Sequence, residues 1–260
     1  MRNRSLLLAP LALTAVASSA RAQAVPPAPG ELVVSEIMFT PACSGSQNTG
    51  EWFEITNVSA KVLDVNGLYF QDGPYAGAGG PDKYFQVLPS VTVLPPLYPG
   101  EKFLFARSND PNQSSAVWNG GLPAVDYVYC SQGASPADKS QVGQASMNFS
   151  SQDIDRMHIS LGAPAALGGT VIDSLSYNPA VAPFPLPYVG GGSGERINLF
   201  APCDTDPVTH ANSPNMAQAL PTATFGNCQP LFKDWGTPRE INSTDASSWP
   251  MFAPYPDSLG

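Results

Sequence analysis

Short runs of β-forming residues, separated by turn residues, recur along the whole chain. The first two runs, Leu32–Phe39 and Trp52–Ile55, flank a loop of Thr, Pro, Cys, Ser, Gly and Asn, and they predict two strands joined by a polar loop. These strands also carry glutamates: Glu36 in the first run, and Glu51 and Glu54 at the second. Carboxylates are the least expected residues in such strands, so they are the first candidates for a special role.

The later runs extend this pattern. With 28 Pro and 23 Gly spread along the chain, long helices are nearly excluded, and no window shows a sustained 3.6-residue apolar period. In Asp155–Leu161, alternation places Met157, Ile159 and Leu161 inward. Further strands are predicted at Gly67–Gln71, Tyr84–Leu88, Ser90–Leu94, Lys102–Ala106, Ala124–Cys130, Thr170–Tyr177 and Ser193–Leu199. The pattern predicts an all-β antiparallel sandwich with long Gly/Pro-rich loops, and a coil-like chain from Ala201 onward.

Alternation also assigns the glutamates to faces. It places Glu51 and Glu54 on opposite faces of their strand, whereas Glu36 and Glu54 can share one face. Glycosidases use two carboxyls about 5–10 Å apart, so this pair is one catalytic candidate. The shared face would also carry four mostly apolar neighbours, Val34, Met38, Trp52 and Thr56. That setting favours a structural pair, bonded to backbone amides or to Arg196.

A further carboxylate, Asp173, shares a face with Val171, Leu175 and Tyr177. A carboxylate on an apolar face must be hydrogen-bonded or paired, because its burial is otherwise costly. Arg196 is a candidate partner for either Asp173 or Glu54. The sequence therefore predicts one structural cluster of three carboxylates and an arginine: Glu36, Glu54, Asp173 and Arg196.

The N-terminus predicts export. Two arginines precede an apolar run of about 12 residues that ends in small residues, which is typical of a cleaved signal peptide over residues 1–22 and too short for a membrane span. Removal of this segment leaves nine basic and 21 acidic residues, a net charge of −12. Such a charge disfavours nucleic acid and anionic membranes as partners. Residues 23–30 read as a linker, 31–242 as one domain and 243–260 as a loosely ordered tail.

The four cysteines all follow the predicted signal peptide. An even number in an exported chain predicts two disulfides, with three possible connectivities. Cys203 and Cys228 are the more local pair, since both lie in one Pro- and Asn-rich segment, and this leaves Cys43 with Cys130. A zinc site is disfavoured because the nearest two cysteines are 25 residues apart and two histidines exist in all.

Catalytic and metal-binding signals are sparse. His158 is predicted to point outward from its strand and His210 lies in a loop, and neither is near a Gly-x-Ser-x-Gly elbow. Asp204 and Asp206 are candidate calcium ligands, although Asx turns explain them equally well and Pro207 breaks the usual calcium-loop pattern. No cofactor is expected.

Several segments together resemble the lamin tail domain in its bacterial secreted branch. They are SEIM, GEWFEITN, GLYFQDG, YPGEKFLF, DRMHISL, GGTVIDSLSY, SGERINL and WGTPREIN, in this order over residues 31–242. Leu68 replaces a frequent Trp, and Arg239 follows Thr237-Pro238 where the family usually has Gly, so the last turn is expected to differ. Insertions at 73–83, 107–144 and 201–235 carry three of the four cysteines.

The resemblance implies an immunoglobulin-like β-sandwich without a catalytic constellation. Lamin tails are interaction modules, and the bacterial relatives are associated with adhesion or targeting. The expectation is therefore a secreted, monomeric, non-enzymatic module that binds an unknown protein or cell-surface ligand. An exported hydrolase or a calcium-dependent carbohydrate-binding protein using the 201–215 loop is the alternative, and a component of an envelope or coat is a third possibility.

Overall fold

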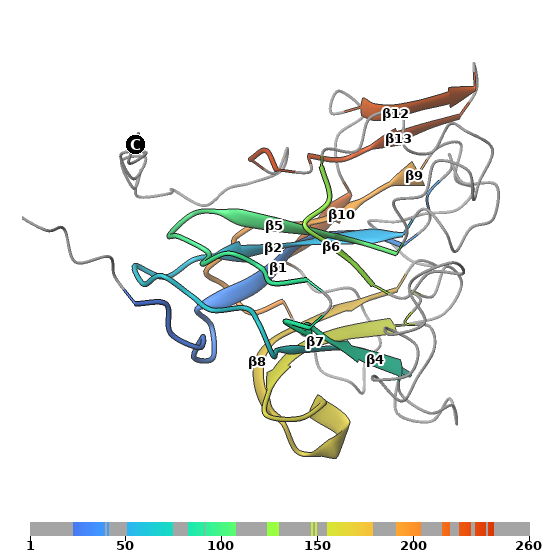
Figure 1. Ribbon diagram of the computed structural model, residues 1–260. Coiled ribbons are helices and arrows are strands. Elements are labelled where there is room, and N and C mark those ends of the chain that lie inside the picture. Colours follow the sequence, from blue (N-terminus) through green and yellow to red (C-terminus); the bar gives the residue numbers. More distant parts are fainter. Residues whose placement is uncertain are drawn as a thin grey trace, which may run out of the picture.

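The computed structural model is built almost entirely of β-strands (Figure 1). It describes residues 23–39, 41, 51–74, 83–90, 92–107, 124–129, 147, 149, 155–178, 191–203, 215–218, 224–229, 232–237 and 239–241. Within them no helix is long and apolar enough to cross a membrane. The predicted signal peptide and the C-terminal tail lie outside these residues.

The first sheet has six strands in the order β11-β10-β1-β2-β5-β6. Its neighbouring strands are antiparallel except for β5 and β6, which are parallel. The pairing of β1 with β2 confirms the predicted hairpin. The strands are β1 (Leu32–Met38), β2 (Trp52–Asn57), β5 (Lys102–Ala106), β6 (Tyr127–Val128), β10 (Gly194–Arg196) and β11 (Met216–Gln218).

The second sheet is fully antiparallel, in the order β4-β3-β7-β8. It is formed by β3 (Tyr69–Pro74), β4 (Lys83–Gln86), β7 (Asp155–Leu161) and β8 (Thr170–Tyr177), with a 3-10 turn at Ala165–Leu167 between the last two. A third, small sheet has the order β12-β13-β9, from Thr224–Gln229, Phe232–Trp235 and Gly191–Gly192.

The order of pairing is that of an immunoglobulin-like sandwich. Strands β1, β2 and β5 lie side by side in one sheet, and β4, β3, β7 and β8 form the other, as strands A, B, E and C′, C, F, G do in that fold. Strand β6 lies beside β5, where the fold usually has its fourth strand. The predicted all-β sandwich is confirmed.

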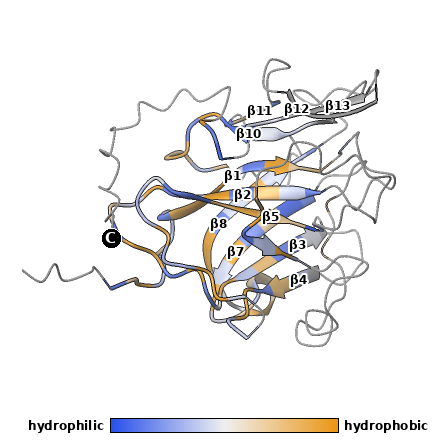
Figure 2. Cartoon of the chain, turned by 45° about the horizontal axis from the view of Figure 1, so that its top comes forward, coloured by the Kyte–Doolittle hydropathy of each residue, from blue (hydrophilic) through white to orange (hydrophobic). Residues whose placement is uncertain are grey.

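Aromatic rings fill the space between the two main sheets. Phe53 of β2 stacks on Phe105 of β5 with ring centroids 4.8 Å apart, and Phe70 of β3 stacks on Phe85 of β4 at 5.1 Å. Figure 2 shows hydrophobic residues, in orange, running through the strands of both sheets. Burial of this shared core is the main stabilising contribution that holds the sheets together.

Two β-bulges change the faces predicted by alternation. In β1 the register shifts between Val34 and Glu36, so that Val34 faces the core and Glu36 the opposite side. In β8 a shift between the partners of Ile159 and Ser160 leaves Ile172 in the core and Val171 40% exposed. The expectations that Val34 shares a face with Glu36, and Val171 one with Leu175, were therefore wrong.

Some strand predictions also need correction. Residues 92–96 are not a strand, and the predicted Ala124–Cys130 strand shortens to β6. The chain after Ala201 is not all coil, because β11, β12 and β13 follow. These strands are short and carry no clear alternation of apolar and polar residues, which is the signal that identified the others.

Candidate functional site

A row of three glutamates crosses the outer face of the first sheet. Glu195 of β10 pairs with Glu36 of β1, and Glu36 pairs with Glu54 of β2. Their neighbours Ile37 and Phe53 face the core, so the glutamates point away from it, and yet all three side chains are fully buried. We call Glu36, Glu54 and Glu195 the carboxylate row.

The row is covered by the C-terminal strap, which we define as residues 236, 237 and 239–241. The Thr237 amide donates to Glu36 Oε1 at 2.8 Å, and Thr237 Oγ1 donates to Glu195 Oε1 at 2.9 Å. The Arg239 amide donates to Glu54 Oε2 at 2.5 Å. The prediction that Glu36 and Glu54 bond to backbone amides is confirmed.

Like charges gather within the row, and Lys102 Nζ lies 2.7 Å from Glu54 Oε1. Burial, followed by the nearby charges of Glu54 and Glu195, raises the pKa of Glu36 to about 8, while bonds from Ser193 and Thr237 oppose this shift. Burial therefore favours the protonated form of Glu36.

Asp173 and Arg196 form a separate site at the junction of the two main sheets. Arg196 Nη2 lies 2.7 Å from Asp173 Oδ2, and the Val34 amide donates to the same oxygen at 2.8 Å, which ties β8 to β1. Burial disfavours the charged guanidinium, but the Asp173 carboxylate outweighs it and keeps the pKa of Arg196 above its usual value. Arg196 thus pairs with Asp173 and not with Glu54, and the predicted single cluster is two clusters.

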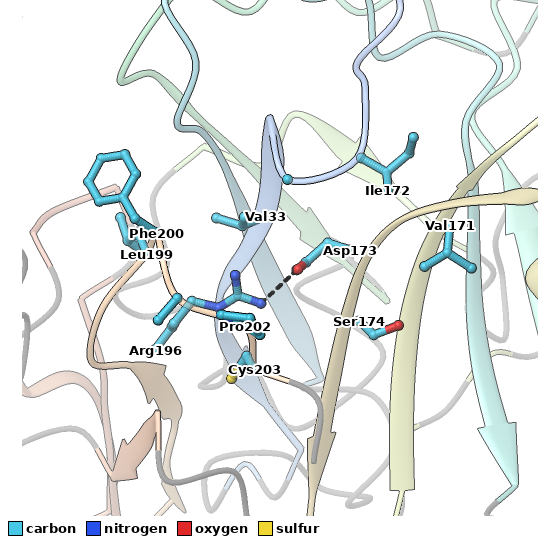
Figure 3. A pocket seen from close by; sticks show the side chains of 12 residues that line it. Val33, Val171, Ile172, Asp173, Ser174, Arg196, Leu199, Phe200, Pro202 and Cys203 are labelled. Atoms are coloured by element: carbon cyan, nitrogen blue, oxygen red, sulfur yellow. Dashed lines mark hydrogen bonds and ion pairs between the residues drawn. The ribbon is translucent and has the colours of Figure 1, made fainter. Parts of the chain in front are cut away.

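A pocket of about 300 Å³ opens beside this ion pair (Figure 3). Asp173 and Arg196 form its floor, and Val171 from β8 and Phe200 from the turn after β10 lie at its rim, 40% and 49% exposed. The remaining lining residues are mostly apolar: Gly30, Val33, Ile172, Ser174, Leu199, Ala201, Pro202 and Cys203.

Two asparagines hold the pocket wall in place. Asn198 Oδ1 accepts the Phe200 amide at 2.9 Å, an Asx turn that orients the ring-bearing residue. Asn215 Nδ2 donates to the carbonyls of Asn198 and Ala201 at 2.8 and 2.9 Å, and its Oδ1 accepts the Asn198 amide. Sequence reasoning missed Asn215, because a single asparagine before a short strand has no distinctive local pattern.

A third buried charge pair joins Glu51 to Arg107. Arg107 Nη1 lies 3.1 Å from Glu51 Oε2, which also accepts the Phe149 amide. Burial raises the pKa of Glu51 to about 8 against the pull of Arg107. Among the described residues, Glu51 Oε1, Arg107 Nε and Tyr129 OH find no hydrogen-bond partner. Glu51 lies on the face opposite Glu54, as predicted, but Arg107 was not foreseen.

The other predicted sites are described only in part. His158 faces outward, as expected, and its Nδ1 lies 2.6 Å from Ser174 Oγ. No three His, Cys, Asp or Glu side chains within the described residues gather as metal ligands. The calcium candidates Asp204 and Asp206, and His210, lie outside those residues.

The predicted disulfides stay predictions. Cys203 is a buried thiol in this structure, with Sγ donating to the Asn215 carbonyl at 3.9 Å. Cys43, Cys130 and the side chain of Cys228 lie outside the described residues.

Comparison with known proteins gives one structural match. No family model and no curated protein matches the chain. A crystal structure of a DUF4876 family protein from Bacteroides thetaiotaomicron VPI-5482 aligns with a TM-score of 0.41 and 12% identity, covering 88% of this chain and 75% of that chain.

Proposed function

We propose that this chain is a secreted, non-enzymatic binding protein of the lamin-tail type, which acts at the cell surface or outside the cell and holds an apolar group of its ligand in the Arg196–Asp173 pocket. The observation that carries the proposal is the pocket itself. It exposes Phe200 and Val171 at the rim of a concave, largely apolar surface. Such a surface is a default candidate for a binding site.

The floor of the pocket narrows the ligand chemistry. Asp173 already accepts bonds from Arg196 and from the Val34 amide, so the two charges of the floor satisfy each other. A charged ligand group would have to compete with this buried pair, which is unfavourable. A neutral apolar group, such as an aliphatic or aromatic side chain, instead buries its surface against Phe200 and Val171 without that cost.

The lamin-tail assignment is supported by where the motif residues meet. Glu36 and Glu54, from the first two motifs, contact Thr237 and Arg239 from the last one. Asp173, from the GGTVIDSLSY motif, contacts Arg196 from SGERINL. Motifs far apart in the sequence therefore meet in two buried clusters, one that ties the C-terminal strap to the first sheet and one that ties β8 to β1 and β10.

Binding of the labelled mature protein, residues 23–260, to surface and envelope fractions of the organism that exports it tests the proposal. We expect saturable binding that Phe200→Ser weakens at least tenfold, because exposed aromatic anchors dominate such contacts. Leu167→Ser, at a site that is 68% exposed and outside the pocket lining, is the matched control and should bind as the parent does.

Four results would reject the proposal. Absence of saturable binding removes the binding role, and equal affinity of Phe200→Ser removes the pocket. Robust turnover of peptide, ester, glycan or phosphodiester substrates would favour the hydrolase. Binding that requires calcium, with a matching rise in melting temperature, would favour the calcium-dependent alternative.

A further inference from the structure

Three buried polar residues lie in one row across the inner face of the first sheet, on the neighbouring strands β2, β5 and β6. The Arg107 amide donates to the Glu51 carbonyl at 3.0 Å, and the Tyr129 amide donates to the Ala106 carbonyl at 2.9 Å. These bonds continue the registers of the three strands by one residue. Glu51, Arg107 and Tyr129 are therefore neighbours on adjacent strands, which lie about 4.8 Å apart. We call them the inner row.

The side chains of the inner row point into the sandwich. Phe53, Phe105 and Tyr127, two residues before or after them on the same three segments, belong to the core between the sheets. Alternate strand residues share a face, so the inner row faces the core as well. Glu51, Arg107 and Tyr129 are accordingly only 1%, 6% and 1% exposed.

Contacts within the row satisfy only part of its hydrogen-bonding capacity. Arg107 Nη1 lies 3.1 Å from Glu51 Oε2, which also accepts the Phe149 amide at 3.3 Å. In the part of the chain that the structure describes, Glu51 Oε1, Arg107 Nε and Tyr129 OH have no hydrogen-bond partner. Burial, followed by the charge of Glu51, raises the pKa of Tyr129 well above its ordinary value. The hydroxyl therefore keeps its proton and lies within reach of the Glu51 charge.

These three atoms define the chemistry of what can join them. Arg107 Nε can only donate, Tyr129 OH can donate or accept, and Glu51 Oε1 accepts when it is ionised. An anion would be repelled by the Glu51 carboxylate, and a cation by the Arg107 guanidinium. A neutral molecule that both donates and accepts fits the set. Water is the smallest such molecule, and about three hydrogen bonds are typical of a buried one.

We propose that one buried water molecule is an integral part of this fold, bound between Glu51 Oε1, Arg107 Nε and Tyr129 OH, and that it fastens β6 to the first sheet. The water accepts bonds from Arg107 and Tyr129 and donates one to Glu51. Strand β6 has two residues and lies at the edge of the sheet, next to β5. Through the water, the Tyr129 side chain gains a link to β2, one strand beyond β5.

The sign of a stability change tests the proposal. Tyr129→Phe removes one bond of the water, so the melting temperature of the mature protein should fall by about 2–4 °C. If the hydroxyl is instead buried dry, the variant removes an unsatisfied polar atom, and the melting temperature should stay the same or rise. Tyr127→Phe is the matched control, because its hydroxyl donates directly to the Gln86 carbonyl at 3.3 Å. Its loss should lower the melting temperature in either case.

A crystal structure of the mature protein, at a resolution that shows ordered waters, identifies the occupant without any substitution. We expect a single peak within about 2.7–3.2 Å of Glu51 Oε1, Arg107 Nε and Tyr129 OH. A site without density would overturn the proposal, and so would density for an ion or a larger molecule. A melting temperature that does not fall in Tyr129→Phe, while it falls in Tyr127→Phe, would overturn it as well.

Discussion

Two buried sites in this molecule stabilise their carboxylates in different ways. At the junction of the sheets, one carboxylate, Asp173, meets one guanidinium, Arg196, and an amide from β1. On the outer face, three carboxylates lie side by side, where Glu36 accepts bonds from a hydroxyl and a strap amide and Glu54 contacts Lys102. The first site pairs one carboxylate with one guanidinium, and the second gathers carboxylates of like charge.

The two sites are also expected to differ in their response to pH. At the junction of the sheets Arg196 keeps its charge, because arginine does not lose its proton in the pH range in which proteins work. Burial raises the pKa of Asp173, and Arg196 opposes that rise. In the carboxylate row, burial and the neighbouring carboxylates raise the pKa of Glu36 to about 8, so its contacts are expected to depend on pH.

The largest expected effect on stability comes from removing the counter-charge of Asp173. Arg196→Met leaves Asp173 buried without its counter-charge, which should lower the free energy of unfolding by about 3–5 kcal/mol. Urea denaturation of the mature protein measures this. Adding Asp173→Asn removes the charge but keeps an oxygen for the Val34 amide, so the double variant should recover part of the loss. A double variant no more stable than Arg196→Met would show that the charge is not the cause.

The second largest effect is the pH dependence of stability that Glu36 in the carboxylate row causes. Folding raises the pKa of Glu36 from 4.5 to about 8, so in that window the folded chain holds a proton that the unfolded chain has released. The free energy of unfolding must then fall as pH rises from about 5 to 8, on the order of 3 kcal/mol, and level off above.

Denaturation of the wild type and of Glu36→Gln at pH 5, 6.5, 8 and 9 measures this window. Glu51 contributes a slope of the same sign, since its pKa is also raised to about 8. Glu36→Gln should therefore flatten the dependence in part, and Glu51→Gln should remove a separate share. A slope that neither variant changes would assign the dependence to other groups.

The two sites also show which structural features the sequence alone predicted. Alternation correctly placed Glu36 and Glu54 on one face and Glu51 on the other, because period-two patterning holds over four residues. It failed for Val34 and Ile172, since a bulge inserts one residue without a sequence signal. The recurring β-forming runs predicted the sandwich but not the third sheet, because TFGNCQ and FKDW in β12 and β13 show no clear alternation of apolar and polar residues.

Long-range partners were the harder part of both sites. Arg196 was left with two candidate partners, because the sequence does not show which strands meet across the sheets. Lys102, Thr237 and Arg239 contact Glu36 or Glu54 from 48 to 201 residues away, and nothing local to either glutamate points to them. Arg239, where the last turn was expected to differ from the family, has a positive φ of +67°.

The third prediction concerns Arg239 in the C-terminal strap, where a smaller effect on the free energy of unfolding is expected. A left-handed non-glycine residue costs about 1 kcal/mol, and the half-exposed contact with Asp126 returns a similar amount at most. Arg239→Gly should therefore change the free energy of unfolding by less than about 1 kcal/mol. Arg239→Ala loses the contact and keeps the strain, so it should be the less stable of the two by about 1 kcal/mol, which urea titration resolves. Equal stability of the two variants would mean that the backbone is not strained.

The smallest effect on stability is expected from Phe200→Ser, at the rim of the pocket beside the Arg196–Asp173 pair. Leu199 and Phe200 are neighbours in one turn, but Leu199 is 2% exposed and Phe200 49%. Leu199→Ala should cost about 2–4 kcal/mol through the cavity that it leaves, whereas Phe200→Ser should cost less than about 0.5 kcal/mol. Phe200→Ser should nevertheless weaken ligand binding at least tenfold, and this loss should not vary from pH 6 to 9, because the phenyl ring carries no titratable group. A loss that grows with pH would tie the pocket to the carboxylate row and remove the distinction between the two sites.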